Sequence, residues 1–160
     1  GEEVGELSVT GTNDYETIYT DTARKALIIV CKNCAMDSKS EISAFAFYPD
    51  SVGFVNEPVF RMDANKIREL SAKSGHHKTS KFQPSAASIH PVTKKLFIIS
   101  SASSQLVIAD QNGNPEQVFE LGEKLFPQPE GLTFKNDGTM YISNEGVTAK
   151  ATVLMFRFKP

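Results

Sequence analysis

The feature that most constrains the fold is a strand–turn–strand pattern that occurs three times along the chain. In each copy a short strand of mostly small or apolar residues leads through a tight polar turn into a more apolar, β-branched strand. The second strand is a nearly continuous apolar run, as expected when both faces of a strand are buried. The copies occupy residues 15–30, 84–100 and 129–143.

Further strand-like runs extend each copy into a larger unit. After the second copy, runs at 105–110 and 117–121 flank an Asn-Gly pair, which is a strong signal for a hairpin turn. Four antiparallel strands in succession are the blade of a β-propeller. Runs at 41–47 and 58–62 complete the first blade in the same way. Only residues 151–158 follow the third copy, so the last blade lacks a fourth strand.

We therefore predict an all-β fold, a single partial β-propeller domain over residues 1–160. Its blades of four antiparallel strands, about three in number, cover approximately residues 8–63, 82–122 and 126–160. A short helix, capped by Asp63, and a loop fill residues 64–81.

Three blades are fewer than the roughly four to eight of a closed propeller. The chain is therefore a fragment of a longer protein, or a second copy completes the ring, or the blades pack in an open arrangement. We favour the fragment, because the chain opens with Gly1 rather than Met and the blade pattern begins almost at once.

Composition narrows the classes of function. A formal net charge of -2 offers no electrostatic footprint for nucleic acid, so we expect no nucleic-acid partner. No run approaches the roughly 18 apolar residues of a membrane-spanning helix. No leader precedes the blades, but a removed leader would leave the same sequence, so export stays open.

The two cysteines form a C-x-x-C motif, Cys31 to Cys34. A thioredoxin-like site needs a helix after the motif, and the polar residues 35–40 do not predict one. Structural zinc needs about four ligands, and no second such motif exists. The motif is better interpreted as the end of a strand, with a local disulfide as an option. His76 and His77 lack a third ligand nearby and are expected in an exposed loop.

Several segments resemble one protein family. These are residues 82–91, residues 96–101, the Phe-Pro-Gln-Pro-Glu-Gly-Leu-Thr-Phe run at 126–134, and residues 137–146. Together they resemble the SdiA-regulated (YjiK-like) family. Residues 14–18 are similar to the family's Asp-x-Glu-Gly-Ile strand start, with Thr17 in place of the usual glycine. The likeness extends over nearly the whole chain and is most specific in its final third.

The resemblance implies a propeller akin to NHL repeats, of the kind found in exported, often lipid-anchored bacterial proteins. It implies a periplasmic or cell-envelope location. Family members are longer at the N-terminus, in agreement with a C-terminal portion here. The family has no firmly assigned reaction, although some related propellers bind calcium near the channel or are described as esterase- or phytase-like.

Glu16, Ser85 and Glu130 occupy the same repeat position, at the start of the innermost strand. In a propeller this position lies near the mouth of the central channel. Glu16 and Glu130, with Asn144 and Glu145 close behind, are candidate oxygen ligands for Ca²⁺, which takes six to eight. The structural alternative is that each glutamate accepts backbone N–H bonds at a neighbouring strand end.

The serine-rich residues 100–104 invite comparison with a nucleophile. No G-x-S-x-G elbow occurs, and His90 lies in a turn before Pro91. We therefore expect these serines in a solvated loop.

The preferred hypothesis is a binding or scaffold module at the bacterial cell envelope, with Ca²⁺ or a small ligand at the channel mouth. The alternative is a calcium-dependent esterase- or phytase-like hydrolase, with Glu16, Glu130 and Glu145 as metal ligands or general base. The partner, a small molecule or a protein, is not specified by the sequence.

Overall fold

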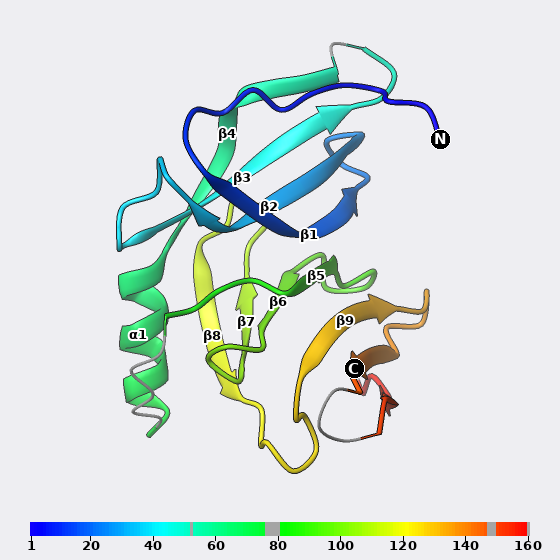
Figure 1. Cartoon of the computed structure of the whole chain (residues 1–160). Coiled ribbons are helices and arrows are strands. Elements are labelled where there is room, and N and C mark those ends of the chain that lie inside the picture. Colours follow the sequence, from blue (N-terminus) through cyan, green and yellow to red (C-terminus); the bar gives the residue numbers. More distant parts are fainter. Residues whose placement is uncertain (52, 76–80, 147–149, 160) are drawn as a thin grey trace.

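The computed structural model describes residues 1–51, 53–75, 81–146 and 150–159. The predicted loop histidines, His76 and His77, lie outside these residues. Strands dominate, and they form three separate antiparallel sheets (Figure 1). The predicted all-β architecture of partial propeller blades is confirmed.

The strands follow one another in each sheet in chain order, as in a propeller blade. The first sheet contains β1 (Asn13–Asp21), β2 (Ala26–Cys34), β3 (Glu41–Tyr48) and β4 (Gly53–Asp63). The second contains β5 (Ala86–Ile89), β6 (Leu96–Ser100), β7 (Gln105–Ala109) and β8 (Pro115–Glu120). The third contains β9 (Pro129–Phe134), β10 (Met140–Asn144) and β11 (Thr152–Phe156). Within the described residues, this third sheet has no fourth strand.

The first strands of the three sheets are neighbours in space. β1 contacts β5, and β5 contacts β9, so the inner edges of the sheets form one continuous wall (Figure 1). Repeat-equivalent residues near the starts of these strands are thereby brought to the same end of the wall. This arrangement is what positions the candidate site.

Two apolar clusters hold the sheets together. One joins the first and second sheets and includes Ile28, Met62 and Ile98, each fully buried. The other joins the second and third sheets and includes Ile99 and Ile142. Neighbouring residues of β6 thus enter opposite clusters. Alternate side chains of a strand point to opposite faces, so a strand between two blades needs the continuous apolar run seen in its sequence.

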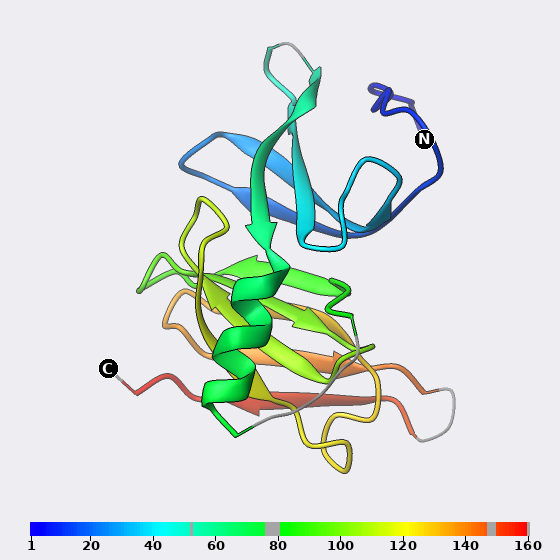
Figure 2. The ribbon, with the colours of Figure 1, turned by 90° about the vertical axis from the view of Figure 1, so that its left-hand side faces the viewer.

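The single helix of the described residues, α1 (Ala64–Lys73), begins where the sequence predicted. The Asp63 carboxylate accepts hydrogen bonds from the backbone N–H groups of Asn65 (2.8 Å) and Lys66 (3.2 Å). These bonds satisfy donors that have no partner inside the helix. The helix lies against β8 at the outer side of the second sheet (Figure 2). No helix in the described ranges is long and apolar enough to cross a membrane.

Helix α1 also packs through its buried face. Ile67 joins the cluster between the first two sheets, and Gln105 donates a buried 2.8 Å hydrogen bond to the Ser71 hydroxyl. The helix therefore covers the outer side of the blades, away from the inner strands β1, β5 and β9 (Figure 1).

Candidate functional site

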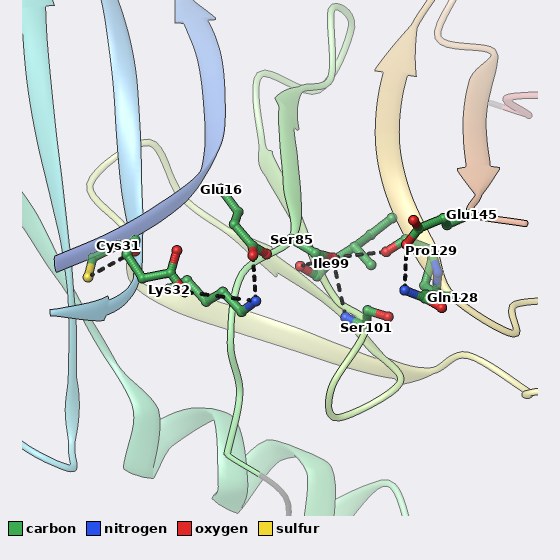
Figure 3. A network of polar contacts seen from close by, with 10 residues as sticks. Glu16, Cys31, Lys32, Ser85, Ile99, Ser101, Gln128, Pro129 and Glu145 are labelled. Atoms are coloured by element: carbon green, nitrogen blue, oxygen red, sulfur yellow. Dashed lines mark hydrogen bonds and ion pairs between the residues drawn. The ribbon is translucent and has the colours of Figure 1, made fainter. Parts of the chain in front are cut away.

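Glu16 and Lys32 are the extra residues of two adjoining β-bulges. In the pairing of β1 with β2, Asp14 faces Asn33 and Tyr15 faces Cys31, which leaves Lys32 without a partner residue. The next pair joins Thr17 to Val30, which leaves Glu16 unpaired in the same way. A bulge re-aims a side chain that regular pleating would send to a fixed face. The two side chains meet in an ion pair, with Lys32 Nζ 2.6 Å from Glu16 Oε1 (Figure 3).

Glu130 is a bulge residue as well. In the pairing of β9 with β10, Gly131 faces Ser143 and Pro129 faces Asn144, so Glu130 is the extra residue. Glu16 and Glu130 thus share both their repeat position and their local backbone irregularity. The equivalent residue of the second blade, Ser85, directly precedes β5.

These positions line one cavity of about 220 Å³ at the end of the wall of inner strands. All three blades contribute to its lining, which consists of Glu16, Lys32, Gln83, Ser85, Ser101, Ala102 and Glu130. The predicted convergence of Glu16, Ser85 and Glu130 is therefore present. Among the described residues that line the cavity, Lys32 is the only cation.

Backbone and hydroxyl groups connect the blades behind this cavity. Ser85 donates through its hydroxyl to the Pro129 carbonyl at 2.9 Å, and the Ser101 N–H donates to Ser85 Oγ at 3.3 Å. Figure 3 shows this chain of contacts running from the second blade into the third. Ser85 is buried, so its role is to fix the inner strands relative to one another.

The environment of Glu130 in this cavity disfavours its ionised form. Burial raises the pKa of this carboxyl, and the charges of Glu16 and Glu145 raise it further. A hydrogen bond from the Ser101 side chain and the charge of Lys32 act in the opposite direction. Burial is therefore the main reason that this pKa lies above its usual range, and a bound cation would offset both the burial and the like charges.

The ammonium group of Lys32 interacts with several carboxylates. Its pKa is raised above the ordinary value, first by its hydrogen bond to Glu16; burial lowers the pKa, and the charges of Glu16, Asp14 and Glu130 raise it. Asp14 Oδ2 lies 4.0 Å from the ammonium. Lys32 therefore serves as the internal counter-ion of this acidic group.

The other two predicted ligands lie to the side of the cavity. Glu145 accepts a 2.6 Å hydrogen bond from the Gln128 side chain, and its charge reaches Glu130. Asn144 is buried, and its side-chain nitrogen donates to Thr152 Oγ1 (2.9 Å) and the Leu125 carbonyl (3.3 Å). Neither residue lines the cavity.

The structural alternative was that each glutamate accepts hydrogen bonds from backbone N–H groups at a neighbouring strand end. Glu16, Glu130 and Glu145 are each bonded to a neighbouring side chain, from Lys32, Ser101 and Gln128 respectively. The Ser101–Glu130 bond joins two blades, the other two bonds each lie within one blade, and none of the three uses a backbone N–H donor.

The donor set suits calcium in kind, since carboxylate and amide carbonyl oxygens are ligands that this ion prefers. The carboxylate oxygens at the cavity are not gathered around a single point. Among the described residues, three or more Cys, His, Asp or Glu ligand atoms lie within 4.8 Å of one another only at Cys31, Cys34 and Asp37. A cation in the cavity would have to take the place of the Lys32 ammonium at Glu16.

Cys31 and Cys34 form a disulfide at the end of β2, with their Cα atoms 5.9 Å apart. No helix follows the motif, in line with the strand-end interpretation. The sequence drew attention to the cysteines and away from Lys32 between them, which is the residue that reaches the cavity.

The serine-rich segment differs from the expectation of a solvated loop. Ser100 and Ser103 are buried, and Ser100 Oγ accepts hydrogen bonds from the N–H groups of Gln83 (3.0 Å) and Ser103 (3.3 Å). The Ser100 hydroxyl thus satisfies one backbone donor in the segment before β5 and one in the turn after β6. Ser101 alone of this segment's serines lines the cavity.

Comparison with known proteins agrees with this architecture. No curated protein matches the chain. The model of the SdiA-regulated family matches residues 49–148, which include Glu130, Asn144 and Glu145 but neither Glu16 nor Lys32. The match covers more than half of the chain, so the chain belongs to the SdiA-regulated family.

Proposed function

We propose that this chain is a binding module whose ligand is a small cation, with Ca²⁺ as the leading candidate. The cation is held in the cavity at the end of the inner strands β1, β5 and β9. The observation that carries the proposal is the matched pair of bulges, which directs Glu16 of the first blade and Glu130 of the third into one cavity. Bulges are frequent beside functional sites because they re-aim side chains.

The charge balance supports a cation over an anion. Glu16 and Glu130 line the cavity, and the charge of Glu145 reaches Glu130. Among the described residues that line the cavity, Lys32 alone carries a positive charge. The Glu16–Lys32 pair is partly exposed, and such pairs contribute only about 0–1 kcal/mol. A divalent ion that gains two carboxylates can therefore displace Lys32 at small cost.

Calcium titration of the intact chain tests the proposal. Isothermal titration should detect one site, and calcium at about 100 times the Kd should raise the free energy of unfolding by about 2.7 kcal/mol. Glu130→Gln should abolish this binding. Glu69→Gln, on the exposed face of α1, makes the same chemical change far from the inner strands and should retain it. An unchanged titration for Glu130→Gln, or no binding at millimolar calcium, would count against the site.

Location at the cell envelope is part of the same proposal. The Cys31–Cys34 disulfide supports it, because disulfides persist in oxidising compartments such as the bacterial periplasm. Fractionation of cells that express the full-length gene product, followed by thiol labelling of each fraction, tests this directly. An entirely cytoplasmic protein with two labelled thiols would contradict it.

A calcium-dependent hydrolase is the second candidate, favoured by the hydrogen bond between Ser101 and Glu130. His90 does not assist such a reaction. It is buried, and its Nδ1 accepts hydrogen bonds from the N–H groups of Val92 (3.2 Å) and Thr93 (3.1 Å). Release of phosphate from phytate and of nitrophenol from a nitrophenyl ester, each with and without calcium, distinguishes the hydrolase from the binding module.

A further inference from the structure

Lys32 occupies the position at Glu16 that a bound cation would need. It contacts Glu16 directly and is attracted by the charges of Asp14 and Glu130. A side-chain ammonium placed in this way competes with any external cation for the same oxygens. Its effectiveness depends on how firmly the backbone at residue 32 is held.

The Cys31–Cys34 disulfide holds that backbone. Three residues of regular strand advance by about 10 Å, whereas the Cα atoms of Cys31 and Cys34 are only 5.9 Å apart. The chain therefore folds back over the span that contains Lys32, and the disulfide closes the fold at its base. Both cysteines are buried, with 1% and 6% of their surface exposed. The bulge is thus anchored in the sheet while its lysine reaches the cavity.

We propose that Lys32 is a built-in competitor for the cation site, clamped there by the Cys31–Cys34 disulfide, so that opening the disulfide raises the affinity of the cavity for a divalent cation. This inference rests on the proposed function and adds its regulation. Without the covalent closure, the bulge at residue 32 has a wider choice of conformations, and its ammonium spends less time at Glu16.

The chemical step is thiol–disulfide exchange with a dithiol reductant. One reductant thiolate attacks a sulfur of the Cys31–Cys34 bond and forms a mixed disulfide, and the second reductant thiol then displaces the protein sulfur. The protein gains two thiols, and the reductant leaves as its own disulfide. Because both cysteines are buried, the reductant reaches them only when this end of β2 opens, so exchange is slower than at an exposed disulfide.

Calcium titrations on four forms of the protein test the inference. Relative to the oxidised wild type, Lys32→Gln should bind calcium about fivefold tighter or more, because it removes the competing charge. The double variant Cys31→Ala/Cys34→Ala should bind tighter by a smaller factor, about two- to fivefold, because its lysine is still present, and it offers no thiolates that could bind metal themselves. Lys66→Gln on α1 removes the same charge outside the site and should leave the Kd unchanged.

A variant that combines Lys32→Gln with Cys31→Ala/Cys34→Ala tests whether the disulfide acts through Lys32. If the disulfide acts through Lys32, adding Lys32→Gln to the cysteine double variant should give the affinity of Lys32→Gln alone, and the two effects should not add. Tighter binding by Lys32→Gln with a wild-type Kd for the cysteine variant would overturn the clamp and leave the proposed cation site standing. Failure of every form to bind millimolar calcium would instead refute the proposed function.

Folding of the cysteine variant is checked by far-ultraviolet circular dichroism. Should it not fold, the same titration is made on the wild type before and after reduction by dithiothreitol, with the free thiols counted. Loss of folded structure on reduction would also overturn the proposal, because a disulfide that the fold cannot lose is not a switch.

Discussion

Gly113 lies directly against the ring of Phe60. A Cβ atom added to Gly113 would fall 2.3 Å from Phe60 Cδ2, and the φ of Gly113 is 78°. This contact joins the turn between β7 and β8 to the outer strand of the first blade. Two separate constraints, a left-handed backbone and a close approach, therefore select glycine here.

Gly113→Ala should lower the free energy of unfolding by about 2–4 kcal/mol, because it adds backbone strain and overpacking against a buried ring. Chemical denaturation measures the change. Gly122→Ala is the matched control, since a Cβ there meets nothing within 4 Å, and it should alter stability by no more than about 0.5 kcal/mol. Equal effects of the two substitutions would contradict the packing argument.

Ionisation of Glu130 should make the protein less stable as the pH rises. Its pKa is raised in the folded state by burial and by the charges of Glu16 and Glu145. Between the ordinary value of 4.5 and this raised pKa, the folded state holds more protons than the unfolded state. The free energy of unfolding therefore falls as the pH rises through that window. Urea denaturation from pH 4 to pH 8, without calcium, measures the slope.

Two substitutions test this slope from opposite sides. Glu130→Gln removes the titrating group and should flatten it. Ser101→Ala removes a hydrogen bond that lowers the Glu130 pKa, so this pKa should rise further. The pH range over which stability falls should then be wider. A slope that is the same in all three proteins would exclude Glu130 as its source.

His90 should produce a slope of the opposite sign. Burial among Phe97, Phe134 and Phe158 lowers its pKa below the ordinary value of 6.5. Between the lowered pKa and about 6.5, the unfolded state holds more protons, so stability falls as the pH is lowered through this window. His90→Asn should lose this dependence, whatever its effect on total stability. Nuclear magnetic resonance titration of the His90 ring would give the folded pKa directly, and an ordinary value would contradict the prediction.

Removal of the helix cap should weaken the outer end of the blades. Asp63→Ala deletes the acceptor for the Asn65 and Lys66 N–H groups and should lower the free energy of unfolding by about 1 kcal/mol. Asp63→Ser keeps an acceptor oxygen and should lower the free energy of unfolding by only a few tenths of about 1 kcal/mol. Thermal unfolding of the two variants side by side gives the comparison, and indistinguishable midpoints would argue against a capping role.

Local signals in the sequence were sufficient for the architecture. The Asn-Gly pair before Asn114 marked the β7–β8 hairpin, and Asp63 marked the start of α1, because each of these features depends on a few adjacent residues. The continuous apolar run of β6 predicted burial on both faces. Ile98 and Ile99 indeed enter different clusters.

The details of the site depend on pairing between strands, which no local pattern specifies. The repeat aligned Glu16 with Glu130, but their bulges follow from the register with β2 and β10. Lys32 was missed for the same reason, since regular pleating gives no indication that residue 32 is left unpaired. Calcium and the ligand set of Glu16, Glu130, Asn144 and Glu145 remain predictions.

The bulges have a consequence for how this site can change over evolution or by design. Glu16, Lys32 and Glu130 have no partner residue across the strand, so replacing any of them removes no cross-strand pair of the sheet. Substitution at these three positions exchanges the chemistry of the cavity while the blades keep their register. The scaffold can therefore be given a new ligand without being given a new fold.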